Sequence, residues 1–247
     1  MQQSFEEKGF VDRCEYLFVD NAGLNNFDAY QSLQKFFKHA KGRHIIVVHQ
    51  DVRCMDDRKK LESALNELYA KDPRWMVCGN AGGAGYHHNI VNISYRDFKE
   101  TYSDLPAIVA TLDENLLIFN AALPLTISGD LTGFHFYGTD VCLLAKILGY
   151  RCYVIDFMVL HFSLGDIGAL EKEKENFVKT YASKIDFGFV PTTCTSLYIT
   201  PGKNRSAFWN SGLGFFLVKQ AKRYPMLLRK AFKKSAKTQR EFFQPKN

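Results

Sequence analysis

The sequence contains no long hydrophobic run. None of its apolar stretches reaches the roughly 18 to 20 consecutive apolar residues that a helix needs to span a bilayer. The first ten residues, MQQSFEEKGF, lack the basic-then-apolar layout of a secretory signal. Both absences argue against an integral membrane protein and a secreted one. We therefore expect a cytoplasmic protein.

Paired cysteines and phosphate-binding glycine motifs are also missing. The six cysteines stand apart in apolar surroundings, without a CxxC pair or zinc-like spacing, so we expect buried thiols. The stretch GNAGGAG at residues 79–85 matches neither GxGxxG nor a P-loop, because no Lys-Ser or Lys-Thr pair follows it. Dinucleotide and ATP sites of these kinds are therefore not supported. The glycines could let the backbone approach a sugar or diphosphate closely, or could form a plain surface turn.

Positive charge is concentrated near the C-terminus. The chain has 247 residues and a net charge of +6, whereas residues 218–247 alone carry ten Lys or Arg and one acid. This division predicts a folded domain over 1–200 and a basic amphipathic extension over 201–247. Basic residues interleaved with apolar ones over 217–242 could contact an anionic membrane surface, or could form a solvated end. We do not expect nucleic-acid binding, because the body shows no second basic patch.

Strand-like and helix-like stretches alternate along the first 155 residues. A helix-spaced apolar stripe lies between Asp56 and Pro73, and a second lies between Asp28 and His39. Short apolar runs predict strands at 15–19, 44–48, 74–78, 108–110, 116–119 and 151–155. Such alternation is typical of an α/β domain with a mostly parallel central sheet and flanking helices.

Polar residues follow two of these predicted strands. Asp20 and Asn21 close the run EYLFVDNAG, and His49, Gln50 and Asp51 close HIIVV. In open α/β sheets, ligands bind beyond the carboxyl ends of the strands. Carboxylates there could hold a hard cation or a ribose, although Asp residues at strand ends also cap or turn the following loops.

Five motifs together resemble a bacterial branch of glycosyltransferase family 2. They are, in order, EYLFVDNAGLNNFDAY, HIIVVHQDV, WMVCGNAGGAG, TLDENLLIF and GFHFYGTDVCLLAKILGYRCYVIDFMVLHFSLG, and they cover residues 9 to about 165. The resemblance implies a GT-A fold with one Rossmann-like sheet that binds a nucleotide-sugar. It also implies a divalent cation, Mn²⁺ or Mg²⁺, on the diphosphate.

The resemblance assigns roles to particular residues. Asp51 would hold the cation, with His161 as a further ligand, and Asp140 would be the general base. The nucleotide-sugar would contact the strand ends and the glycine-rich stretch, through Asp20, Asn21, His49, Gln50, Asp51, Gly79, Asn80, Gly82 and Gly83. The acceptor or its sugar would contact two later segments, through Asp113, Glu114, Tyr137, Gly138 and Thr139.

Three of these residues have an ordinary structural alternative. An acid in the first turn of a helix, such as Asp140, can be explained by capping and the helix dipole. A lone histidine after a strand, such as His161, is often a structural residue, although a neutral imidazole suits Mn²⁺. His49 could contact a phosphate or point into the sheet.

The function that this resemblance implies is transfer of a sugar from a nucleotide-diphosphate-sugar to a saccharide or lipid-linked acceptor. The transfer would invert the anomeric carbon and serve bacterial surface polysaccharide synthesis. The alternative is a non-catalytic GT-A-like module that binds a saccharide or a partner protein. Two features favour it: the chain lacks the strand that usually opens this family, and Gln50 stands where many relatives have an acid. A nucleotidyltransferase is a third interpretation.

Overall fold

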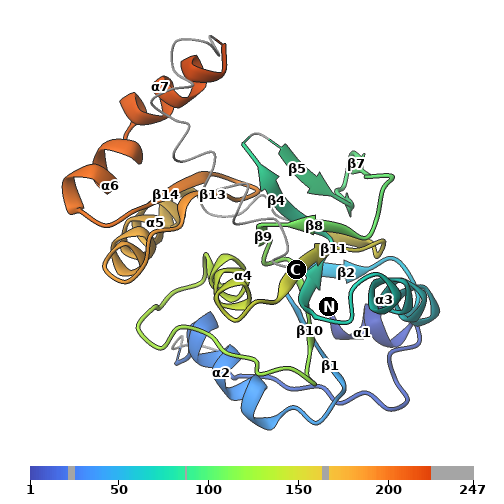
Figure 1. Ribbon diagram of the computed structural model, residues 1–247. Coiled ribbons are helices and arrows are strands. Elements are labelled where there is room, and N and C mark those ends of the chain that lie inside the picture. Colours follow the sequence, from blue (N-terminus) through green and yellow to red (C-terminus); the bar gives the residue numbers. More distant parts are fainter. Residues whose placement is uncertain (22–25, 87, 163–166, 224–247) are drawn as a thin grey trace. The chain divides into compact units, whose positions relative to one another are not determined.

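The computed structural model describes residues 1–21, 26–86, 88–162 and 167–223 (Figure 1). The chain forms two compact units, one of Met1–Glu173 with Pro191–Cys194 and the other of Lys174–Val190 with Thr195–Asn247. The predicted boundary at residue 200 stays a prediction. Among the helices of the described segments, none has both the length and the apolar character needed to cross a membrane.

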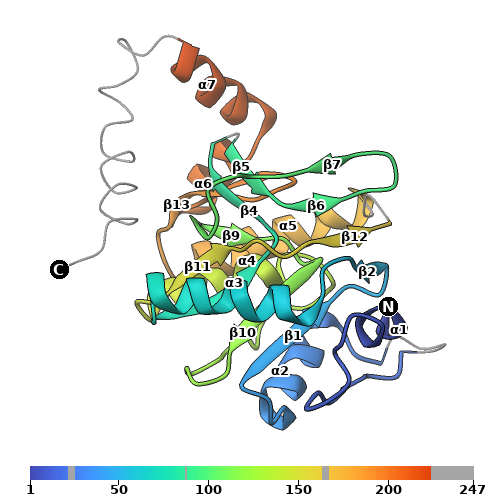
Figure 2. The same ribbon diagram turned by 90° about the vertical axis from the view of Figure 1, so that its right-hand side faces the viewer.

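The first unit is built on a five-stranded sheet in the order β1-β10-β3-β11-β8. Its central strands are apolar and fully buried, because the sheet is covered on both sides: α3 lies against one face and α4 against the other (Figures 1 and 2). The bounds of these elements are β1 His44–Val48, β3 Trp75–Gly79, β8 Ala107–Val109, β10 Leu116–Asn120, β11 Arg151–Val154, α3 Arg58–Lys71 and α4 Tyr137–Ile147.

Three smaller sheets complete the structure. A four-stranded sheet runs in the order β2-β12-β6-β7, with β2 at Val52–Cys54, β12 at Val159–His161, β6 at Ile93–Ser94 and β7 at Lys99–Glu100. A three-stranded sheet joins β5 His88–Val91, β4 Ala81–Gly85 and β9 Thr111–Leu112. A two-stranded sheet pairs β13 Gly188–Pro191 with β14 Ser196–Ile199.

The prediction of one mostly parallel, Rossmann-like sheet is wrong. In the five-stranded sheet only β3 and β11 run parallel, and the pairs β1–β10, β10–β3 and β11–β8 are antiparallel. The chain passes from β3 to β10 through successive short strands without an intervening helix. Connections of this kind produce antiparallel pairs, whereas parallel neighbours need a long crossover.

The two predicted helices are confirmed, and their caps explain where they begin. The side chain of Asp28 accepts a hydrogen bond from the backbone N–H of Gln31, which opens α2 at Ala29–His39. The side chain of Asp57 accepts one from Lys60 N and opens α3. The predicted stripe of α3 faces the core through Leu61, Ala64, Leu65 and Leu68. A short helix, α1 at Gln2–Glu6, adds Phe5 to the same core.

One predicted strand is absent from the structure. Residues 15–19 form no strand, and Leu17 and Phe18 expose 38% and 61% of their surface. The run is apolar, but among the described residues it pairs with no strand. The other predicted strands are confirmed within one or two residues as β1, β3, β8, β10 and β11. Four of the six cysteines are buried, and Cys14 and Cys194 are exposed.

The second unit contains α5 Ile167–Ala182, which begins in the first unit, followed by α6 Lys203–Trp209 and α7 Gly212–Arg223. Phe177, Tyr181 and Phe187 are buried in it, and the rings of Tyr181 and Phe187 lie 5.7 Å apart. Most of the predicted basic extension, from residue 224 on, lies outside the described residues.

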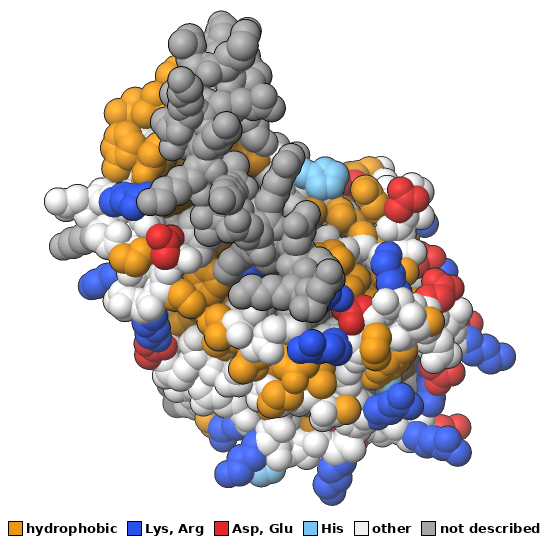
Figure 3. All heavy atoms as spheres, viewed as in Figure 1, with side chains coloured by type: hydrophobic (Ala, Val, Ile, Leu, Met, Phe, Trp, Pro, Cys, Tyr) orange, Lys and Arg blue, Asp and Glu red, His pale blue; other side chains and the backbone are white. Residues whose placement is uncertain are grey.

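Charged side chains of both signs share the face shown in Figure 3. Over the described part of this face, Lys and Arg side chains stand among Asp and Glu side chains. This distribution contrasts with the sequence of residues 218–247, which is almost purely basic.

Candidate metal centre

The candidate centre forms where β1 ends and the chain turns into β2. His49 follows β1, and its backbone N–H donates to Asn115 O at 3.2 Å. The N–H of Val52 donates back to His49 O at 3.3 Å, so that Asp51 stands at the tip of a tight turn. His161 ends β12, where it pairs with Val52 of β2. This pairing brings a residue 110 positions further along the chain beside Asp51.

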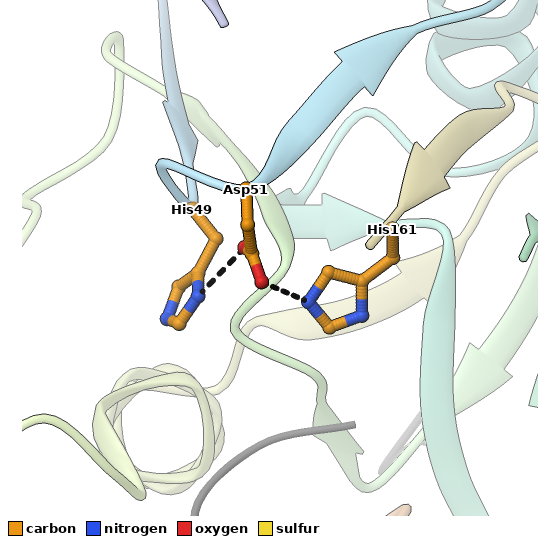
Figure 4. A group of neighbouring side chains, drawn as sticks. All are labelled: His49, Asp51 and His161. Atoms are coloured by element: carbon orange, nitrogen blue, oxygen red, sulfur yellow. Dashed lines mark hydrogen bonds and ion pairs between the residues drawn. The ribbon is translucent and has the colours of Figure 1, made fainter. Parts of the chain in front are cut away.

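Three side chains converge there (Figure 4). The carboxylate of Asp51 lies between two imidazoles, with its Oδ1 3.3 Å from His49 Nδ1 and its Oδ2 3.4 Å from His161 Nε2. One ligand atom from each residue can be chosen so that all three lie within 4.8 Å of one another. The two rings are nearly perpendicular, with centroids 6.2 Å apart. Three donors at this spacing can bind one ion.

The surroundings of the His161 imidazole suit a bound cation. Its Nε2 is buried and makes no hydrogen bond with any residue in the described segments, although a carboxylate oxygen stands 3.4 Å away. A buried polar atom without a hydrogen bond costs stability unless a ligand or water satisfies it. A divalent cation between imidazole and carboxylate would satisfy both. His49 is 41% exposed, so the centre opens to solvent on that side.

Two acids of the segment between β9 and β10, Asp113 and Glu114, lie near Tyr137 at the start of α4. Burial raises the pKa of the Tyr137 hydroxyl well above its ordinary value, and the nearby charges of Glu114, Asp113 and Asp51 raise it further. Burial, followed by the charge of Asp113, also raises the pKa of Glu114 to about 8. Glu114 accepts a hydrogen bond from Gly138 N at 3.2 Å. The predicted acceptor residues thus gather around this edge of α4.

Asp140 has a structural role in this arrangement. It is completely buried, and its two oxygens accept hydrogen bonds from Ser128, from the backbone N–H at 2.8 Å and from the hydroxyl at 2.6 Å. These bonds tie the segment before α4 to the first turn of that helix. Thr139 is buried beside it. The general-base role predicted for Asp140 was part of the sugar transfer that the resemblance implied.

Asp20 and Asn21 do not end a strand. Asn21 closes the following loop: its amide donates to Phe27 O at 2.7 Å, and its Oδ1 accepts from Phe27 N at 3.0 Å. Asp20 is exposed. Among the described residues, the structure brings together His49, Asp51 and His161, and neither Asp20 nor Asn21 is part of this group.

The glycine-rich stretch is packed against protein backbone. Residues 81–85 form β4, the central strand of the three-stranded sheet. A Cβ on Gly83 would lie 2.7 Å from Pro191 O, and one on Gly79 would lie 2.5 Å from Leu116 O. These glycines therefore allow close approach of neighbouring strands, and the predicted alternative of a surface turn is wrong.

Sequence reasoning assigned His49 to the nucleotide and not to the metal. The available signal was its spacing: His49 and Asp51 are two residues apart at a strand end, and a second histidine, His161, ends another strand. Two histidines and one carboxylate form a recurrent ligand set for divalent transition metals. Gln50, predicted with them, is exposed at the turn.

Comparison with known proteins gives one informative relative. The chain is 34% identical over 171 residues to a protein of Fuscovulum blasticum named "ATP synthase subunits region ORF 6", an alignment that covers 65% of this chain and 68% of that protein. The chain belongs to the family of this ORF 6 protein. No protein-family model matches the chain.

Membership of the ORF 6 family corrects the functional expectation. The name of the ORF 6 protein refers to a region of ATP synthase subunits and does not describe a glycosyltransferase. The predicted sugar transfer is therefore wrong on this comparison, and the mixed sheets remove the Rossmann-like fold on which it also relied. The nucleotide-sugar and acceptor partners stay predictions.

Proposed function

We propose that this protein binds a divalent transition-metal ion through His49, Asp51 and His161 and presents the ion to an oxygen ligand. The convergence of two imidazoles and one carboxylate within 4.8 Å supports the proposal most directly. Mn²⁺ and Fe²⁺ accept this mixed nitrogen and oxygen set and prefer more than three ligands. The remaining positions would be taken by water or by an anionic oxygen group.

A metal bound in this way has a clear chemical use. It polarises an oxygen ligand or lowers the pKa of a bound water, and both effects support a metal-dependent enzyme. Binding alone would also suit a protein that recognises an anion through the ion. The proposal retains the divalent cation that the sequence predicted, and it names no enzyme class. A cytoplasmic location is part of the same proposal.

Titration of the purified chain with Mn²⁺, followed by electron paramagnetic resonance of the free ion, tests the proposal. We expect one bound ion per chain in the wild type. Asp51→Asn and His161→Ala should lower the affinity by about 100-fold or more, because each removes a direct ligand. His39→Ala is the matched control, since His39 is exposed at the end of α2 and does not belong to the group of three ligands. Equal affinity in all four proteins would exclude the site.

A further inference from the structure

Two buried asparagines, Asn80 after β3 and Asn115 before β10, each have an amide oxygen without a hydrogen bond to a described residue. Asn80 and Asn115 expose 0% and 2% of their surface. The Oδ1 of each finds no partner among the residues that the structure describes. An unpaired buried amide oxygen costs free energy, so each position calls for a physical account. The two differ in the side of the sheet on which they lie.

Asn115 lies on the same face as His49. The N–H of His49 donates to Asn115 O, which continues the antiparallel register of β1 and β10 by one pair beyond Val48 and Leu116. Side chains directly opposite in such a ladder point to the same face, with Cβ atoms about 5 Å apart. The register therefore places the side chains of Asn115 and His49 on the same face.

The hydrogen bonds of Asn115 determine which way its amide points. Its Nδ2 donates to Asp113 Oδ1 at 2.7 Å, and Asp113 Oδ2 accepts from the hydroxyl of Thr193 at 2.6 Å. A carboxylate accepts and does not donate, so the nitrogen of the amide must face Asp113. The Oδ1 is then directed away from Asp113, and it is held there by a chain of two short hydrogen bonds.

Asn80 faces the opposite side of the sheet. It follows β3 two residues after Cys78, which packs with Leu65 of α3 in the main core. The amide of Asn80 donates to Asn92 O at 3.5 Å, and Asn92 donates to Asp156, which pairs with Lys60 of α3. Asn80 thus belongs to the polar contacts on the α3 side, across the sheet from Asn115.

We propose that Asn115 is an outer-shell residue of the metal centre, whose Oδ1 accepts a hydrogen bond from a water bound to the ion. The inference rests on the proposed function. A water on a divalent cation is a strong donor, and it would satisfy the Asn115 Oδ1, which has no hydrogen bond to a described residue. Asn115 then links the ion to Asp113 and Thr193 without being a ligand itself.

The test compares Asn115→Leu with Asn80→Leu. The two substitutions remove the same groups from equally buried positions and keep the approximate shape. We expect Asn115→Leu to weaken Mn²⁺ binding by about 10- to 100-fold, the usual effect of removing an outer-shell partner. Asn80→Leu should bind Mn²⁺ as the wild type does. Asn115→Ser, which keeps a small polar group and is more easily folded, should lose affinity in the same way.

A second measurement separates a held water from a general change in structure. The water-proton relaxation rate per bound Mn²⁺ reports the waters that the ion retains. It should be lower in Asn115→Leu and Asn115→Ser at saturating metal than in the wild type and Asn80→Leu. If the Asn115 variants keep wild-type affinity and relaxation while Asp51→Asn still loses the ion, the role of Asn115 is overturned. The proposed function then still stands. Absence of Mn²⁺ binding in the wild type would instead overturn the proposed function.

Discussion

Two groups of buried or half-buried polar residues differ in how their charges are satisfied: one lies beside α3, and the other lies beyond the end of β1. On the α3 side, Asp72 accepts hydrogen bonds from Arg74 N at 2.9 Å, from the Tyr153 hydroxyl at 2.8 Å and from the Arg151 guanidinium at 3.0 Å. Beyond the end of β1, Asp51 faces two imidazoles, and one buried imidazole nitrogen has no hydrogen bond to a described residue.

The two groups differ in what satisfies their hydrogen-bonding atoms. In one group the protein itself does so and the fold is stabilised, and in the other we expect a ligand to do so. A carboxylate surrounded by N–H and O–H donors is satisfied by the protein itself, and its removal costs stability. A group of donors and acceptors left open to one side costs stability until an ion or another ligand completes it. Substitutions in each of the two groups test this comparison.

The largest effect is expected from Asp51→Asn. The ordinary consequence of removing a structural carboxylate is destabilisation, but here the metal-free protein should unfold at the wild-type temperature or slightly above it. Saturating Mn²⁺ should raise the unfolding temperature of the wild type and leave that of Asp51→Asn unchanged, because a ligand stabilises only the state that binds it. Thermal unfolding with EDTA and with Mn²⁺ measures both. A marked loss of stability in EDTA would contradict the distinction.

On the α3 side, Asp72→Asn should give the reverse result. We expect a loss of about 3 kcal/mol in the free energy of unfolding, because the variant leaves donors around position 72 without a charged acceptor. Affinity for Mn²⁺ should not change. The exposed pair of Arg58 and Glu62 on α3 provides the control: Glu62→Gln should cost about 0.5 kcal/mol or less. Urea unfolding of the wild type, Asp72→Asn and Glu62→Gln measures these changes in the free energy of unfolding.

The pH dependence of the same carboxyl follows from its surroundings. Burial of Asp72 acts to raise its pKa, but the hydrogen bonds from Arg74, Tyr153 and Arg151 outweigh this and lower it below the ordinary value. The native state therefore binds the proton less readily than the unfolded state. The contribution of Asp72 is complete above the unfolded pKa and is lost as the pH falls through the folded pKa. The stability difference between wild type and Asp72→Asn should shrink in acid.

The sequence predicted the α3 side far better than the candidate centre. The stripe of α3 and the strands β3 and β10 follow from local patterns of apolar residues, and the structure confirms them. Strand direction did not follow, because it depends on how β10 inserts between β1 and β3. The pairing of His161 with Asp51 depends on β12 meeting β2, a contact between distant segments that no local pattern encodes.

A substitution at Gly83 tests whether the glycines of residues 79–85 serve strand packing or ligand binding. A Cβ there would lie 2.7 Å from Pro191 O, so Gly83→Ala should destabilise the protein by about 2 kcal/mol through overpacking. Gly85→Ala in the same strand is the control, because its Cβ would meet only His88 Cβ at an ordinary 3.6 Å. Affinity for Mn²⁺ should be equal in both variants. Unchanged stability in Gly83→Ala would remove the packing account.

The smallest effect should come from Glu114, whose pH dependence has the opposite sign to that of Asp72. Burial and the charge of Asp113 raise the pKa of Glu114 to about 8, so between its unfolded pKa and pH 8 the native state holds a proton that the unfolded state releases. Stability therefore falls as the pH rises through this window. Glu114→Gln keeps the neutral form and should raise the unfolding temperature at pH 8 by about 2 to 4 °C, with a smaller gain at pH 5. The measurement is made in EDTA, since an ion at Asp51 would favour the charged carboxylate. A gain of equal size at both pH values would show that the variant acts through packing and not through the proton.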